Sequence, residues 1–150
     1  INYLRQKIND RNLQNRIRTV CNSFDEFYSE TDRYDMIMAE GFLNIVGFEI
    51  GFKKIIELLN ETGYLVIHDE YKDHNKKLEF INENNCTIIN TLFLDEKIWW
   101  NDYYKQLENE INKISTLEIE KIFKSDIEEI KFYKSNPSIF NSIYYIIMKT

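Results

Sequence analysis

Hydrophobic residues recur along this chain in two patterns, one typical of helices and one of buried strands. Spacing of three and four residues predicts helices over 2–12, Phe48–Leu59, 75–84, from Asp95 through Ile114, and Leu117–Phe132. Short apolar or alternating runs predict strands over Ile17–Cys21, Tyr34–Ala39, Tyr64–His68, Thr87–Leu94 and Ile143–Met148.

The order of these elements predicts the fold class. Helices alternate with strands along most of the chain, which indicates βαβ units and an α/β fold with a mostly parallel sheet. Two helices stand together before the last strand, as an insertion. Gly63 follows the helix Phe48–Leu59 and is expected to form a left-handed cap. Asp95 is expected to cap the helix that follows it.

Length and charge narrow the class of protein. The 150 residues, 43% hydrophobic and 29% charged, predict one globular domain, 1–150. The formal net charge is −6, and basic residues alternate with acidic ones. Because backbone binding to nucleic acid needs clustered Lys and Arg, a nucleic-acid partner is disfavoured.

Targeting and metal signals are absent from the sequence. No apolar run reaches the ~18 residues of a membrane helix, and no signal peptide is visible. Cys21 and Cys86 have no C-x-x-C partner, so we expect reduced thiols and no metal site. Together with the missing membrane helix and signal peptide, this predicts a cytoplasmic protein without a membrane partner. The chain begins at Ile1 inside a helical pattern, which favours a fragment.

Candidate chemistry lies where predicted strands end, since ligands bind at the carboxyl ends of strands in open α/β sheets. Glu40 and Gly41 follow one strand; the alternative is an ordinary solvated loop. His68 and Asp69 end the next, as candidates for a general base or a substrate contact; the alternative for His68 is an ordinary strand-end residue.

An aromatic stripe in the inserted helix pair is a candidate wall for a substrate pocket. Trp99 and Tyr103 share one helical face, as do Trp100 and Tyr104. The alternative is core packing of the inserted helices on the sheet.

Several segments together resemble the class I S-adenosylmethionine-dependent methyltransferases, in a small-molecule, type 11-like subgroup. Asp35–Gly41 matches the family's D-x-I-x-x-E-G segment, and Gly47, Phe48, Glu49 and Gly51 match its G-F-E-x-G. Leu58–Val66 is similar to L-L-K-P-G-G-Y-L, with Asn60-Glu61-Thr62 in place of Lys-Pro-Gly. The run Trp99–Tyr104 resembles W-W-x-x-Y-Y, and Ile143–Met148 resembles the family's final strand.

The resemblance implies a Rossmann-like methyltransferase fold, truncated at the N-terminus so that the first two strands are absent. The helix pair is inserted before the last strand, which runs antiparallel between its neighbours. The glycine-rich loop that cradles the methionine part of the cofactor has no match in the chain, nor has the acidic residue that holds the ribose. The strand Ile17–Cys21 then lacks its usual partner, and pairing with another copy as a homodimer is one way to supply it.

The resemblance also implies a ligand set, with S-adenosylmethionine as co-substrate and a small-molecule acceptor. It implies cofactor contacts from Asn22, Ser23, Phe24, Asp25, Glu40, Gly41 and Phe42, and Asn44 stands where the close subgroup has a Tyr. With the strand-end His68 and the aromatic stripe, the candidate substrate contacts are Asn44, His68, Trp99, Trp100, Tyr103 and Tyr104. Two other functions stay open. One is a catalytically silent binding or regulatory module that kept the fold, and the other is a different Rossmann-like cofactor enzyme.

Overall fold

The computed structural model describes residues 1–24, 26–27, 32–113 and 121–150. These residues form two compact units, Ile1–Asp32 and Arg33–Thr150, and each unit is described by itself. The prediction of one domain over 1–150 concerns how the two units combine, so it stays a prediction.

The first unit contains the helix α1 (Asn2–Asp10), which confirms the helix predicted there. Ile8 is its buried residue, and Arg5 Nε donates a hydrogen bond to Thr19 Oγ1 at 3.1 Å. The predicted strand Ile17–Cys21 is wrong, because these residues are irregular and belong to no ladder. Alternating apolar residues favour a strand only where a second strand completes its hydrogen bonds, and Ile17 and Val20 are exposed.

The second unit contains a sheet of four described strands: β1 (Tyr34–Glu40), β2 (Leu59–Glu70), β3 (Cys86–Leu94) and β4 (Ser142–Lys149). The strand order is β1-β2-β4-β3. β1 and β2 are parallel, whereas β4 is antiparallel to both β2 and β3. The predicted antiparallel last strand between its neighbours is thus confirmed.

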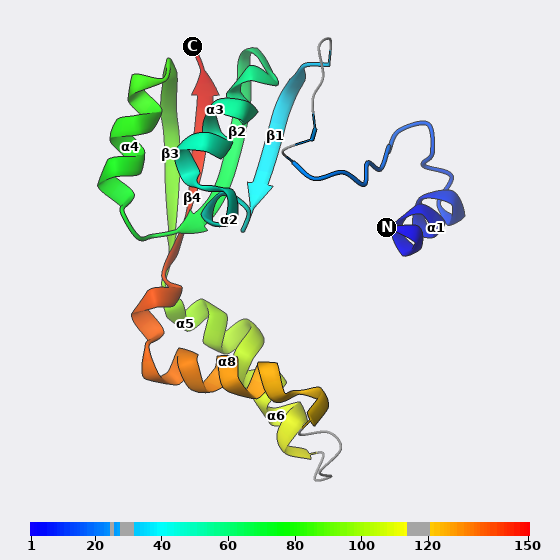
Figure 1. Ribbon diagram of the computed structural model, residues 1–150, viewed down its shortest axis with the longest axis vertical. Coiled ribbons are helices and arrows are strands. Elements are labelled where there is room, and N and C mark those ends of the chain that lie inside the picture. Colours follow the sequence, from blue (N-terminus) through cyan, green and yellow to red (C-terminus); the bar gives the residue numbers. More distant parts are fainter. Residues whose placement is uncertain (25, 28–31, 114–120) are drawn as a thin grey trace. The chain divides into compact units, whose positions relative to one another are not determined.

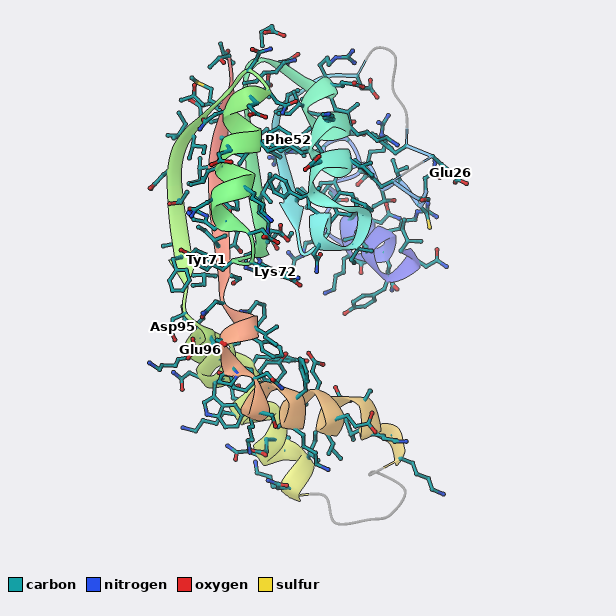
Figure 2. The ribbon with its side chains drawn as sticks, turned by 60° about the vertical axis from the view of Figure 1, so that its left-hand side comes forward. Glu26, Phe52, Tyr71, Lys72, Asp95 and Glu96 are labelled. Carbon is teal, nitrogen blue, oxygen red and sulfur yellow. The ribbon has the colours of Figure 1, made fainter. Side chains whose placement is uncertain are left out.

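Three helices cover one face of this sheet (Figure 1): α2 (Leu43–Val46), α3 (Phe48–Glu57) and α4 (His74–Glu83). Buried side chains of β2 alternate with more exposed ones, so Leu65 and Ile67 face these helices. The ring of Phe52, on α3, is fully buried and packs edge-on against the ring of Phe80, on α4, at 5.7 Å (Figure 2). Tyr145 of β4 is buried in the same layer.

Gly63 has a different role from the predicted helix cap. α3 ends at Glu57 with a right-handed cap at Leu58, and Gly63 lies inside β2. The left-handed residue is Thr62, with φ 61°. A Cβ on Gly63 would lie 2.9 Å from the Asn60 carbonyl oxygen, so close backbone approach, and not a cap, requires glycine here.

The predicted helix pair is present between β3 and β4, although positions 114 and 117–120 of the predicted helices lie outside the described residues. It consists of α5 (Glu96–Trp99), the π-helix η1 (Trp100–Tyr104), α6 (Lys105–Lys113), α8 (Lys124–Ser135) and the 3₁₀ helix η2 (Pro137–Phe140). The predicted cap is confirmed, since Asp95 Oδ1 accepts a hydrogen bond from the Lys97 N–H at 2.9 Å. Figure 2 shows Asp95 and Glu96 where β3 passes into these helices.

The helices have a small core of their own. Tyr104, Ile130 and Tyr133 are buried together, with partly buried Trp100 and Phe140 packed against them. Two hydrogen bonds to Glu96 link this core to the start of α5. Tyr133 Oη donates to the Glu96 carbonyl oxygen at 3.0 Å, and Asn141 Oδ1 accepts from the Glu96 N–H at 2.9 Å.

Gly51→Ala tests the packing of α2 on α3. A Cβ at Gly51 would collide with Leu43 Cδ2 and lie 2.9 Å from Val46 Cγ2. Because Leu43 is fully buried, we expect a loss of about 1–3 kcal/mol in the free energy of unfolding, measured in urea. The matched control is Ile50→Ala on the exposed side of the same helix, expected within about 0.5 kcal/mol of wild type. Equal stability of G51A and wild type would contradict this packing.

Candidate functional site

A pocket of about 350 Å³ opens at the carboxyl ends of β1 and β2. The chain segments that form it are the strand ends, the start of β4, α2 and the inserted helices. Its lining residues are Gly41, Asn44, His68, Asp69, Glu70, Trp99, Phe132, Ile139, Phe140, Asn141 and Ser142. The structure therefore brings together five residues singled out from the sequence: Gly41, Asn44, His68, Asp69 and Trp99.

His68 is held by three neighbours. Its Nε2 lies 2.9 Å from Ser142 Oγ, and Ser142 is buried. Its ring stacks on Tyr144, with the centroids 4.3 Å apart and an interplanar angle of 11°. Trp99 lies nearly parallel on His68 at 6.0 Å. In the tautomer whose Nε2–H donates to Ser142 Oγ, Nδ1 is the ring atom that can accept a proton.

Burial lowers the pKa of His68 below its ordinary value of 6.5, and the nearby carboxylates of Glu40 and Asp69 only partly oppose this effect. Burial disfavours the charged imidazolium, so the ring is mainly neutral at neutral pH. A neutral imidazole is the form that can act as a general base.

The side chain of Asp69 points to the opposite face of the sheet from that of His68. Successive strand residues point to opposite faces, and the Asp69 carboxylate is on the α4 side, where Lys77 Nζ lies 2.7 Å from its Oδ2. The two side chains are only 2% and 11% exposed. Oδ1 is buried and has no hydrogen-bond partner among the described residues. This geometry gives Asp69 a structural ion pair and favours His68 as the base.

The segment after β1 supplies an open stretch of backbone. Gly41 has φ 56°, and its N–H donates a hydrogen bond to the His68 carbonyl oxygen at 3.2 Å. A Cβ on Gly41 would meet no atom within 4 Å, so there is space for a ligand against the backbone. Glu40 Oε1 lies 3.5 Å from Tyr144 Oη, which is a long contact, and Phe42 begins α2.

The aromatic stripe divides between the pocket and the helical core. Trp99 lines the pocket, whereas Trp100 stacks on Tyr133 at 5.5 Å and Tyr104 is 4% exposed. Tyr104 Oη donates to Glu129 Oε1 at 2.6 Å, and burial followed by this carboxylate raises the pKa of Tyr104. Tyr103 is exposed and contacts Tyr104 edge-on. Core packing therefore accounts for Trp100 and Tyr104.

The other predicted cofactor residues belong to the first unit. Ser23 and Phe24 lie in a turn, in which the Ser23 carbonyl oxygen accepts from the Glu26 N–H at 3.2 Å. Asn22 precedes this turn, and Asp25 lies outside the described residues. Because each unit is described by itself, the contacts predicted for these four residues stay predictions.

Sequence reasoning missed several residues of the site, above all Ser142, which lines the pocket, and Tyr144, which stacks on His68; both lie at the start of β4. An available signal was the antiparallel direction predicted for the last strand. An antiparallel strand begins where its parallel neighbours end, and Ser142 indeed pairs with Glu70. The other pocket residues had no comparable signal in the sequence, because their position depends on how α8 and η2 return the chain to the sheet. These residues are Phe132, Ile139, Phe140 and Asn141.

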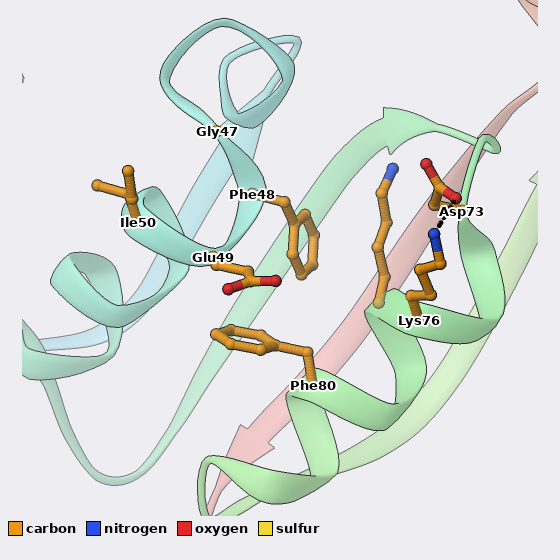
Figure 3. A pocket seen from close by; sticks show the side chains of 8 residues that line it. Gly47, Phe48, Glu49, Ile50, Asp73, Lys76 and Phe80 are labelled. Atoms are coloured by element: carbon orange, nitrogen blue, oxygen red, sulfur yellow. Dashed lines mark ion pairs between the residues drawn. The ribbon is translucent and has the colours of Figure 1, made fainter.

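A second cavity, of about 410 Å³, lies between the start of α3 and the side of α4 (Figure 3). The ring of Phe48 and the ring of Phe80 line it together with Lys76 and Lys77. Both lysines are engaged: Lys76 pairs with Asp73 at 3.1 Å, and Lys77 pairs with Asp69. None of the predicted site residues lines it, so we place the candidate site at the strand ends.

The described part of the chain contains neither a group of metal ligands nor a membrane-spanning helix. No group of three or more His, Cys, Asp or Glu residues there is arranged to hold a metal ion. No described helix is long and apolar enough to cross a membrane.

Solved structures of similar architecture match nearly the whole chain. An S-adenosylmethionine-dependent methyltransferase from Geobacter sulfurreducens in complex with S-adenosyl-L-homocysteine has a TM-score of 0.69 at 10% identity, over 97% of this chain and 70% of that one. The O-methyltransferase of a trans-AT polyketide synthase multienzyme from Brevibacillus brevis, also with S-adenosyl-L-homocysteine, has a TM-score of 0.61 at 18% identity, over 97% and 53%. The [4+2]-cyclase SpnF has a TM-score of 0.73 at 12% identity, over 97% and 60%.

These likenesses show the fold: the chain has the Rossmann-like fold of class I S-adenosylmethionine-dependent methyltransferases. It spans between 53% and 70% of the length of these three structures. No family model and no curated protein sequence matches it.

The lowered pKa of His68 predicts a pH effect on stability. The unfolded chain binds a proton at about 6.5, and folded His68 binds it only at lower pH. The contribution of neutral His68 to the free energy of unfolding is therefore fully present above pH 6.5. It is lost as the pH falls through 6.5 toward the lower pKa of the folded protein. In an NMR titration of the two histidine rings, we expect the His68 midpoint below 6.5.

The matched measurement is urea unfolding at neutral pH and near pH 5.5. His68→Gln should reduce the loss of stability on acidification, and His74→Gln should remove a further part, because burial followed by Lys77 also lowers the pKa of His74. A His68 midpoint above 6.5 would show that the carboxylates outweigh burial.

Proposed function

We propose that the full-length protein transfers a methyl group from S-adenosylmethionine to a small-molecule acceptor. The observation that carries the proposal is the pocket at the carboxyl ends of β1 and β2. Three features meet in this pocket. Gly41 has a left-handed backbone with space around it, the His68 ring is positioned by Ser142, and Trp99 forms an aromatic wall. In open α/β sheets this edge is where ligands bind.

The residues present fit the cofactor on its side of the pocket. Space above Gly41 lets a ligand lie against the backbone, as a bulky adenosyl group needs. Two of the similar structures contain S-adenosyl-L-homocysteine. By the resemblance, Glu40, Gly41 and Phe42 would hold the cofactor, with Asn22, Ser23, Phe24 and Asp25 on its adenine side.

When bound, S-adenosylmethionine supplies an electrophilic methyl group on a sulfonium. The chain's own task is then to orient the acceptor and exclude water. Trp99, Phe132 and Phe140 supply an apolar wall for this purpose. Neutral His68 takes the acceptor's proton while Ser142 fixes the ring, and Asn44 supplies a polar contact.

The proposal concerns the full-length, cytoplasmic protein, with the 150-residue chain inactive alone. No stretch of this chain resembles the glycine-rich loop that holds the methionine part of the cofactor. The pocket described above is therefore the acceptor side and one edge of the cofactor side.

A second candidate is a binding module that kept the fold without methyl transfer. The observation in its favour is that the [4+2]-cyclase SpnF has a similar architecture, with a TM-score of 0.73. One fold can serve unrelated activities. The two candidates differ in whether the protein turns over S-adenosylmethionine.

Calorimetric titration with S-adenosyl-L-homocysteine tests cofactor binding. We expect full-length protein to bind with a dissociation constant in the micromolar range, about −8 kcal/mol, and the 150-residue chain to bind at least about tenfold more weakly. No heat with full-length protein at millimolar ligand would exclude the methyltransferase. Equally tight binding by the 150-residue chain would show that the cofactor site lies wholly within it.

His68→Gln tests the base. With an acceptor that full-length protein methylates, we expect kcat to fall by about 10²–10⁴-fold while the affinity for S-adenosyl-L-homocysteine changes little. His74→Gln is the control, because His74 binds Tyr145 Oη at 2.9 Å on the other face of the sheet. Unchanged kcat in H68Q would remove His68 from proton transfer.

A further inference from the structure

We propose that the pocket takes an acceptor whose reacting end is an amine, carried on an apolar body, and that it rejects carboxylates and phosphates. This inference rests on the proposed function and specifies the substrate class of the same site. It follows from the charges, rings and hydrogen-bond donors that the chain places around His68.

The charged residues at the pocket are acidic. Glu70 is among its lining residues, and Glu40 lies 3.5 Å from Tyr144 beside His68. Asp69 also lines the pocket, but its carboxylate pairs with Lys77 on the other face of the sheet. No Lys or Arg is among the lining residues that the structure describes. Lys77 Nζ pairs with the Asp69 carboxylate and also donates to the backbone carbonyl oxygen of Glu70 at 2.6 Å. Neither the Glu40 nor the Glu70 carboxylate forms an ion pair with a described cation.

The carboxylates nearest to His68 indicate the sign of the electrostatic potential in the pocket. Glu40 lies directly beside His68 in the β1–β2 register, and Tyr144 lies beside it on β4. Burial lowers the pKa of His68 overall, and the carboxylates of Glu40 and, to a smaller extent, Asp69 oppose that lowering because they favour positive charge on the ring. An ammonium group near that ring would experience the same attraction, and a carboxylate would be repelled.

The walls suit an organic cation with an apolar body. Trp99 lies parallel to His68, and Phe132 and Phe140 complete the aromatic lining. Aromatic faces attract cations as well as apolar groups, because the face of the ring carries negative charge density. A small polar solute without an apolar part would leave these rings without a partner.

Donors for an anion are scarce in the lining. Anion sites usually rely on Arg or Lys, which form charge-assisted hydrogen bonds. The side-chain donors of the described lining are all neutral: the Ser142 hydroxyl beside His68, the indole N–H of Trp99, and the amides of Asn44 and Asn141.

The test uses three probes that share one ring and differ in charge: benzylamine, benzyl alcohol and benzoate. Each is titrated into full-length protein saturated with S-adenosyl-L-homocysteine, near pH 7.5, and followed by ligand-detected NMR. We expect benzylamine to bind at least about tenfold more tightly than benzoate, with benzyl alcohol between them.

Glu70→Gln is the informative variant, because Glu70 lines the pocket but is not among the predicted cofactor contacts. It should reduce the benzylamine-to-benzoate ratio by about threefold or more. Glu83→Gln, at the far end of α4, is the matched control and should leave the ratio unchanged.

The outcomes separate the two proposals. Benzoate binding as tightly as benzylamine, undetectable benzylamine at millimolar concentration, or an unchanged ratio in E70Q would overturn the amine selectivity. Failure of S-adenosyl-L-homocysteine to bind would overturn the proposed function. In that case the same probes, titrated without it, would still measure the selectivity of the pocket.

Discussion

The insertion of β4 between β2 and β3, antiparallel to both, is the constraint on which the rest of this structure depends. It supplies the hydrogen-bond partners of two strands at once and buries Tyr145 and Ile147 under the helices. Because β4 runs opposite to β2, its first residues lie at the carboxyl end of β2. The pocket forms because β4 begins at the end of the sheet where β2 ends.

Local patterns predicted most of the sheet unit, and most clearly β2 and β4, where buried side chains alternate with more exposed ones. The helix α3 and the last strand were predicted nearly at their observed bounds. Gly63 shows where local reasoning ends: a glycine after a helix is typical of a cap, but contact with Tyr34 on another strand decides its role. Similarly, alternation over Ile17–Cys21 could not reveal whether a partner strand was present.

The sequence predicted the part of the site that lies at the carboxyl ends of the strands. Gly41 and His68 were found because the carboxyl ends of adjacent parallel strands meet. The division of the aromatic stripe was not predictable, since it depends on how α8 packs against η1. That packing places Trp100 and Tyr104 on Tyr133, whereas Trp99, one residue before η1, reaches the pocket.

The pair His68 and Asp69 shows how a single strand serves both stability and chemistry. Alternation along β2 places the Asp69 carboxylate against Lys77 in the helix-covered layer, where loss of one partner leaves a buried charge. The same alternation turns His68 to the other side, where Ser142 and Tyr144 fix a ring that burial keeps neutral. Asp69, paired with Lys77, opposes the lowering of the His68 pKa less than Glu40 does, so the acidic character of the pocket depends mainly on the strand-end carboxylates that form no ion pair with a described cation.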